Sequence, residues 1–433
     1  MEPIFVLLIV LGSVVVLFVV TIIIIYVIAS LINPTKRDPI QIENKTGFVK
    51  AYKTSLYDEN GHKLILNGTN LGNWFVQEPW MTVSAINGSF ENKFGYIQRK
   101  SIEAFKSNPN LNDEQIEELK KLYIDTYIKE EDFRTIKELG LNVVRINFTC
   151  YNLTTDGYII NPDAFLKIDW AIEMAKKYGL YVILDNHGAI GSQNSDDHSG
   201  DDSHYELYGN EKNENATIEI WKFIADRYKD NKTVIIYDLL NEPRRAAHKF
   251  TGKKQFDFYD RLYQEIRKID TNHIIMMECF TFPIHGVSPK KYNWENYAYS
   301  YHIYNLTSFS ERFAINFYRV LHNVLHYKVP IVIGEFSCWE KKKDWYVAIN
   351  MFEKMGWSYL MWTYKANCYY YSRHSSKSFH FKLWGFYESD IKPVDINSAS
   401  YKEIKEAYLN TETKYCHTTL IYDVYNDLVN RVR

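Results

Sequence analysis

The chain has 433 residues, of which 46% are hydrophobic and 24% charged, proportions that are ordinary for a folded globular protein. Its 51 basic and 53 acidic residues leave a net charge of −2. This balance excludes a basic nucleic-acid-binding protein and a disordered, highly charged chain.

The N-terminal part of the chain is strongly apolar. No residue between positions 4 and 32 is charged. As a helix this segment would be about 43 Å long, which exceeds the roughly 30 Å hydrocarbon core of a bilayer. A signal peptide has an apolar stretch of only about 7–15 residues after a basic start. Residues 1–33 are therefore predicted to form a transmembrane anchor and residues 34–433 one folded domain, with cleavage after Ala29 as the alternative.

Two signals disagree about the side of the membrane on which the domain lies. Lys36 and Arg37 follow the apolar segment and favour a cytoplasmic domain by the positive-inside rule. Asn-x-Ser/Thr triplets favour an exported glycoprotein, because glycans attach only there. We expect a single-pass membrane protein with an extracellular or lumenal domain. The triplets start at Asn44, Asn67, Asn87, Asn147, Asn152, Asn215, Asn231 and Asn305.

The rest of the chain reads as a hairpin followed by alternating strands and helices. An Asn60-Gly61 turn between residues 48–57 and 63–67 predicts the hairpin. Helices are predicted at residues 131–139, 163–178 and 218–228, the last capped by Asn215. The insertion over residues 81–128 is expected to contain one helix, residues 113–123. Short apolar runs that suit buried parallel strands lie at residues 64–70, 143–147, 180–186, 234–240, 273–278, 298–304, 331–335 and 357–362.

Eight strands alternating with helices favour an α/β fold, the (β/α)8 TIM barrel, over a doubly wound sheet. In such a barrel the active site lies at the carboxyl ends of the strands. Two carboxylates stand there, Glu242 after the fourth strand and Glu335 after the seventh. A facing pair suits glycoside hydrolysis, in which one carboxyl protonates the leaving oxygen and the other attacks the anomeric carbon. The other strand-end residues are Asn70 with Asn73, Arg145, His187, Asn241, His302 with Tyr304, and Trp362.

Other patterns point to no further chemistry. The acidic and histidine-rich stretch over residues 196–204 lacks the spacing of a calcium loop, so we expect a solvated loop. The five cysteines are too few for a disulfide scaffold and lack zinc-site spacing. Neither a metal nor an organic cofactor is implied.

Several segments share the motifs of a known family. They include Leu-Leu-Asn-Glu-Pro at residues 239–243, His-Ile-Tyr at 302–304 and Gly-Glu-Phe-Ser at 334–337. With residues 70–80, 141–146, 185–194 and 362–365, they resemble glycoside hydrolase family 5, a family of retaining (β/α)8 enzymes, and in particular the fungal exo-β-1,3-glucanases. The resemblance implies Glu242 as acid/base and Glu335 as nucleophile. It implies substrate-binding roles for Glu78, Arg145, His187, Asn241, His302, Tyr304 and Trp362.

The sequence departs from those glucanases at Asp196 and Thr307, where they carry phenylalanines that clamp the next sugar. The expected function is that of a membrane-anchored retaining β-glycosidase acting on a β-glucan or another β-glucoside. Its two carboxyl groups should lie about 5–5.5 Å apart. One alternative is a catalytically silent carbohydrate-binding membrane protein. Another is a glycolipid β-glucosidase, because an anchor would hold the site near a bilayer.

Overall fold

The computed structural model describes residues 38–87, 97–203, 205–243, 253–279, 291–304, 308–324, 327–369 and 384–432, with scattered residues between 12 and 31. Within these ranges eight parallel strands close into a barrel, and each lies where a strand was predicted. Neighbours in the chain are neighbours in the barrel, and the last strand pairs with the first. The strands are β4 (Asn67–Asn70), β6 (Val143–Thr149), β9 (Tyr181–Gly188), β10 (Val234–Asp238), β11 (Ile274–Glu278), β12 (Tyr297–Tyr304), β13 (Ile331–Ser337) and β14 (Ser358–Met361).

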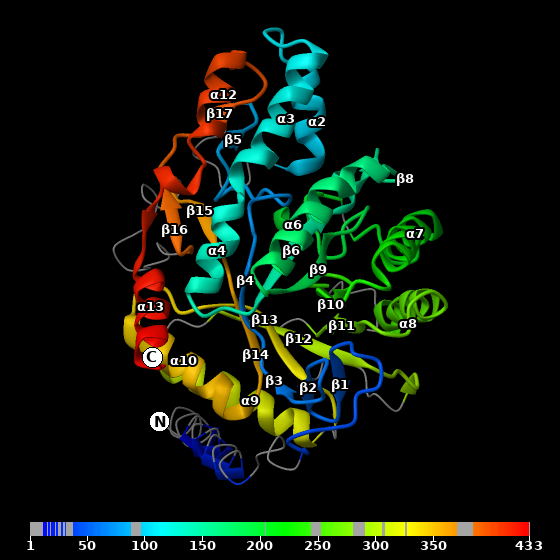
Figure 1. Cartoon of the computed structure of the whole chain (residues 1–433), viewed down its shortest axis with the longest axis vertical. Helices are drawn as coiled ribbons and strands as arrows, with labels where there is room; N and C mark the ends of the chain where they lie inside the picture. Colours follow the sequence, from blue (N-terminus) through cyan, green and yellow to red (C-terminus); the bar gives the residue numbers. More distant parts are fainter. Residues whose placement is uncertain are drawn as a thin grey trace, which may run out of the picture.

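Helices surround the barrel, as Figure 1 shows. The (β/α)8 architecture is thereby confirmed for the described residues. The helices that follow barrel strands are α6 (Leu166–Lys177), α7 (Glu211–Tyr228), α8 (Lys253–Arg267), α9 (Ser308–Val324) and α10 (Lys342–Met355). The others are α2 (Gln98–Lys106), α3 (Asp113–Tyr127), α4 (Glu130–Glu138), the short α5 (Cys150–Leu153), α12 (Tyr401–Leu409) and α13 (Leu420–Val432). Short strands outside the barrel pair as β5 (Ser84–Ala85) with β17 (Val394–Asp395), β7 (Thr154–Thr155) with β8 (Ile159–Ile160), and β15 (Lys365–Asn367) with β16 (Tyr387–Ser389) and β18 (His417–Thr418).

Alternation along each strand sorts its side chains into two layers. On β6, Val143 belongs to the cluster inside the barrel, whereas Val144 and Ile146 belong to the cluster between strands and helices. Because successive side chains on a strand point to opposite faces, Arg145 and Asn147 share the inward side of Val143. The interior is therefore apolar near the amino ends of the strands and polar near their carboxyl ends.

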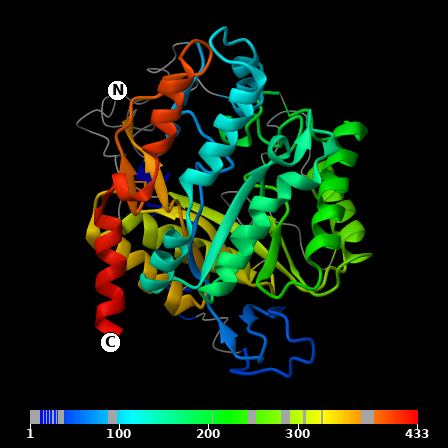
Figure 2. The ribbon, with the colours of Figure 1, turned by 45° about the horizontal axis from the view of Figure 1, so that its top comes forward.

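A small antiparallel sheet closes the amino-terminal end of the barrel. It consists of β1 (Lys50–Tyr52), β2 (Ser55–Tyr57) and β3 (Lys63–Leu64), with the predicted Asn60-Gly61 turn between β2 and β3. The predicted hairpin is thus a three-stranded sheet, because residues 48–57 fold back on themselves. Val49 and Leu56 pack with the barrel's inner apolar cluster. Figures 1 and 2 show this sheet at the end of the molecule opposite α3 and α12.

Two helix predictions were incomplete. The insertion contains α2 as well as α3, and α3 starts with a capping box between Asn112 and Gln115. Helix α7 is capped by Asn210 and not by Asn215, which lies inside it. Its first turn is polar, so the apolar pattern revealed only the later turns, which pack against the barrel.

The predicted anchor, residues 1–33, lies largely outside the described residues. Those described between positions 12 and 31 are helical. Among the described residues, none of the helices has the length and apolar character needed to cross a membrane.

Candidate active site

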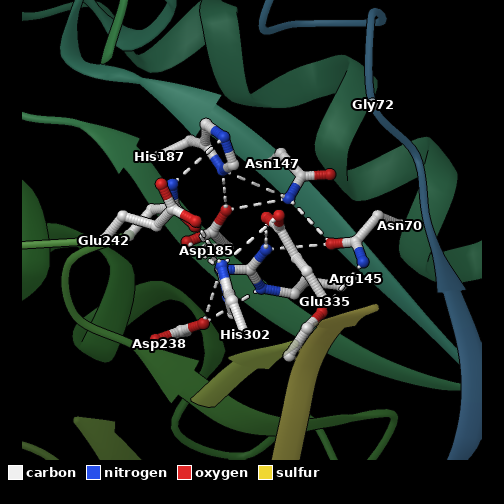
Figure 3. A network of polar contacts seen from close by, with 12 residues as sticks. Asn70, Gly72, Arg145, Asn147, Asp185, His187, Asp238, Glu242, His302 and Glu335 are labelled. Carbon is white, nitrogen blue, oxygen red and sulfur yellow. Dashed lines mark hydrogen bonds and ion pairs between the residues drawn. The ribbon is translucent and has the colours of Figure 1, made fainter. Parts of the chain in front are cut away.

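Arg145 occupies the centre of the polar end of the barrel (Figure 3). Its fully buried guanidinium contacts three carboxylates: Asp185 at 2.9 Å, Asp238 at 2.8 Å and Glu335 at 3.0 Å. One cation cannot balance three buried anions. Burial accordingly raises the pKa of Asp238 well above its usual value, despite the opposing charge of Arg145. The crowding of three carboxyl groups around one guanidinium thus favours the protonated form of Asp238.

Glu335 reaches the interior because β13 contains a bulge. The pairing of β12 with β13 shifts register between Tyr301 and His302, so that Gly334 is the extra residue. A Cβ on Gly334 would lie 2.5 Å from Ser300 Oγ, so a larger side chain would not fit there. The Glu335 carboxylate accepts from Arg145 Nη1 at 3.0 Å and from Tyr304 Oη at 2.6 Å. These two donors fix its orientation.

Glu242 follows β10 with its backbone in the left-handed region, at φ 43°. Its amide N–H donates to Glu278 Oε2, and this contact holds the unusual turn. The side chain faces two histidines, with Oε1 2.8 Å from His302 Nδ1 and Oε2 3.2 Å from His198 Nε2. Burial alone would raise the pKa of Glu242. The hydrogen bond from His302 and the charges of both histidines outweigh burial and hold this pKa at about 2.

His302 bridges the two candidate catalytic carboxylates. Its Nδ1 lies 2.8 Å from Glu242 and 3.3 Å from Glu335, and its Nε2 lies 2.7 Å from Glu278. Although burial opposes protonation, Glu278 and Glu335 raise the pKa of His302 well above 6.5. One ligand atom each of Glu242, His302 and Glu335 lie within 4.8 Å of one another, and the direct contacts of His302 with both carboxylates account for this spacing.

His187 and Asn241 form the opposite side of the site. His187 Nδ1 lies 2.7 Å from Asp185 Oδ2, and its Nε2 lies 3.2 Å from Asn241 Nδ2. Asn241 Oδ1 accepts from Arg145. The Trp362 ring stacks on His187 with centroids 5.3 Å apart and planes at 16°. Since Trp362 is only 2% exposed, it offers little surface to a sugar in this structure.

Glu78 lies beside an aromatic wall. Trp80 Nε1 donates to Glu78 Oε2 at 2.5 Å, and the Trp80 ring packs against Trp384 at 4.3 Å between centroids. Trp384 also contacts Trp339 and Tyr304. Burial raises the pKa of Glu78 to about 8, so its carboxyl group is protonated at neutral pH and able to donate a hydrogen bond.

The structure thus gathers all nine predicted site residues at one end of the barrel, directly or through shared neighbours. Sequence reasoning missed Asp185, Asp238 and Glu278, which are buried carboxylates on barrel strands. The signal was available, because each occupies an inward position by the alternation of its strand.

The expectation of a solvated loop over residues 196–204 was wrong. Asp201 is 1% exposed and pairs with Arg99 at 3.0 Å, and His198 contacts Glu242. Spacing alone could not show that this stretch folds over the carboxyl end of the barrel. Asp196 lies 4.0 Å from His198 Nε2. Thr307 lies outside the described residues.

The glycosylation triplet that starts at Asn147 is not accessible in the folded protein. Its side chain is fully buried and donates to Asp185 Oδ2 at 2.8 Å and Asn70 Oδ1 at 3.1 Å. A glycan cannot reach this nitrogen in the folded protein. Asn147 is therefore part of the barrel's polar interior and not a glycan acceptor.

Comparison with known proteins adds family evidence to this geometry. Residues 102–368 match the model of "Cellulase (glycosyl hydrolase family 5)". The chain is 29% identical over 273 residues to a β-xylosidase of Phanerodontia chrysosporium, covering 60% of this chain and 53% of that protein. It is 32% identical over 262 residues to glucan 1,3-β-glucosidase 2 of Wickerhamomyces anomalus, covering 59% and 58%. The match thus spans less than two thirds of the length of these relatives.

Solved structures show the same fold. Rutinosidase from Aspergillus niger superimposes with a TM-score of 0.59 at 16% identity, over 80% of this chain and 98% of that one. An endogalactoceramidase superimposes with a TM-score of 0.54, also at 16% identity, over 73% and 74%. At such identity the likeness concerns the fold alone.

Proposed function

This chain belongs to glycosyl hydrolase family 5, and from that premise we propose that it hydrolyses β-glucosidic bonds with retention of anomeric configuration. One observation carries the proposal. An oxygen of Glu242 and an oxygen of Glu335 lie within 4.8 Å of each other. Retaining glycosidases separate their two carboxyl groups by about 5–5.5 Å, whereas inverting ones need roughly 6.5–9.5 Å to admit a water.

The contacts of Glu335 and Glu242 support different catalytic roles for the two residues. Glu335, oriented by Arg145 and Tyr304, attacks the anomeric carbon and forms a covalent glycosyl intermediate. Glu242 protonates the departing oxygen and then takes a proton from the water that hydrolyses the intermediate. Asn241, fixed between Arg145 and His187, is placed to bind the sugar 2-hydroxyl, and Glu78 to bind another hydroxyl.

The substrate proposed first is a β-glucan or a simple β-glucoside, as the names of the glucan 1,3-β-glucosidase relatives suggest. A glycolipid is the second candidate, and the aromatic wall formed by Trp80, Trp339 and Trp384 beside the site is compatible with it. Such a wall suits either a sugar face or an apolar aglycone. A β-xyloside is the third candidate substrate, because one relative is a β-xylosidase.

We also propose that the N-terminal segment anchors the domain to a membrane on its extracellular or lumenal side. Described apolar side chains of that segment lack a protein cover: Val14, Leu17 and Leu31 are 58%, 68% and 80% exposed. Such surface is unfavourable in water and favourable in a bilayer. Carbonate extraction and protease protection of the full chain in cells would test both parts. Release by carbonate would contradict the anchor, and digestion of the domain by protease added outside sealed microsomes would contradict its orientation.

The decisive experiment is hydrolysis by the full chain. The panel contains laminarin, mixed-linkage glucan, cellulose oligomers, mannan, an aryl β-glucoside, an aryl β-xyloside and a glucosylceramide, with the first-formed anomer followed by NMR. We expect a β-anomer first, and turnover abolished in Glu335→Gln but unchanged in Glu219→Gln, a control on the exposed face of α7. An α-anomer would refute retention. Binding without turnover on every substrate would favour a silent carbohydrate-binding protein.

A further inference from the structure

We propose that His198 is the proton partner of Glu242: it stores the proton that Glu242 delivers to the leaving group and takes it back afterwards. This inference rests on the proposed function. The chemistry requires a proton for the leaving group. A carboxyl group paired with two histidines is ionised at rest, so Glu242 cannot supply that proton by itself.

Two groups meet at one nitrogen of His198. His198 Nε2 lies 3.2 Å from Glu242 Oε2 and 2.7 Å from Asn194 Nδ2. The orientation of the Asn194 amide is set by its oxygen, which accepts from Asp196 N at 2.9 Å. Nε2 therefore faces a carboxylate, which accepts, and an amide N–H, which donates.

These two neighbours favour opposite states of the ring. A protonated Nε2 donates to the Glu242 carboxylate. An unprotonated Nε2 has one lone pair, which accepts either from Asn194 or from a protonated Glu242. A single proton can thus lie on either partner, and each position has a satisfied hydrogen bond. An imidazole between one acceptor and one donor suits a proton shuttle better than a fixed ion pair.

The loop that carries His198 is held firmly. The short helix η3 (Asp197–Ser199) ends at Gly200, whose carbonyl accepts from Arg99 N at 2.9 Å. Ser199 is fully buried, and its hydroxyl lies 2.9 Å from Ser192 Oγ. The His198 side chain is 16% exposed, so its position is fixed by the loop, with limited freedom to turn away from Glu242.

The surrounding charges keep a proton available at this position. Glu242, Glu78, Asp196 and Asp197 face the ring, and the neighbouring His187 ring lies 5.9 Å away. Burial lowers the pKa of His198, but the charges of Glu242, Asp196 and Asp197 raise it above 6.5 overall.

The proton can be followed through one turnover. At rest it lies on His198 Nε2. It moves to Glu242 Oε2 and then to the glycosidic oxygen, as the bond from that oxygen to the anomeric carbon breaks and the bond to Glu335 forms. In the second step water gives a proton to Glu242 and its oxygen to the anomeric carbon, displacing Glu335. The proton then returns to His198, so one water is consumed and no other reactant is needed.

The activity test uses His198→Asn in the full chain, with His62→Asn, a histidine with a 57% exposed side chain, as the matched control. General acid–base catalysis contributes about 10²–10⁴-fold, so we expect kcat/KM on an unactivated glucoside to fall about 10–100-fold. Dinitrophenyl β-glucoside, whose leaving group needs no proton, should change less than about 3-fold. The basic limb of the pH profile should move to lower pH. Equal losses on both substrates would mean a merely structural role and overturn the proposal.

A second readout does not need activity. NMR titration of the His198 ring in the full chain should give a pKa above 6.5, and Glu242→Gln should lower it. An unchanged His198 titration in that variant would overturn the pairing, whether or not a substrate is found. Coupled titration without hydrolysis of any substrate would support the pairing and refute the proposed function, so the two failures are distinguishable.

Discussion

Replacing Arg145 with methionine tests whether its positive charge stabilises the buried carboxyl groups of the barrel interior. The guanidinium is fully buried and contacts Asp185, Asp238 and Glu335. Methionine would fill a similar volume but leave these carboxylates without their cation. A protein that loses one partner of a buried ion pair is destabilised by about 3–5 kcal/mol. We expect Arg145→Met to lower the free energy of unfolding by that amount at pH 7.

The size of this loss should depend on pH. Burial alone would raise the pKa of Asp185, and the charge of Arg145 is the largest influence that lowers it overall. A lowered carboxyl pKa stabilises the fold above its unfolded value of 3.8, and this contribution is lost as the pH falls through the folded value. The deficit of the variant should therefore be full at neutral pH and shrink at acid pH.

Urea unfolding followed by tryptophan fluorescence measures this deficit in the full chain. Arg227→Met is the control, because Arg227 pairs with Asp169 at the surface and such pairs contribute less than about 1 kcal/mol. A loss in Arg145→Met no larger than in the control, or one that does not change with pH, would refute the reasoning.

Three further predictions follow from single positions. A Cβ on Gly188 would lie 1.9 Å from the Ser199 carbonyl oxygen, so Gly188→Ala should displace the adjacent loop and lower both kcat/KM and, by about 1–3 kcal/mol, stability; unchanged kinetics would contradict this. Between about pH 4.5 and 8 the folded protein retains the Glu78 proton that the unfolded chain releases, so stability should fall as pH rises there, and Glu78→Gln should flatten that slope in urea titrations. In peptide mapping of protein extracted from membranes, exposed Asn215 should carry a glycan and buried Asn147 none; a glycan at Asn147 would contradict its position in the barrel.

Much of the site could be predicted, because the alternation of side chains along a strand and the barrel fold together determine which residues face the site. Every second residue of a barrel strand points inward, and inward residues near the carboxyl end face the site. Arg145, His187 and His302 follow from this rule. Glu335 does not follow from simple alternation, because the Gly334 bulge shifts its register.

The sequence alone determined the order of the barrel strands, the family motifs and the chemistry of the strand ends, because these depend on local pattern. Only the tertiary structure decided which distant groups meet. It brought Glu278 to His302 and His198 to Glu242, and it placed a protonated Glu78 beside the aromatic wall. The physical reason is that burial and Coulomb interactions act through space. The path of a loop over the barrel end, and the pKa values that it produces, are absent from any local pattern.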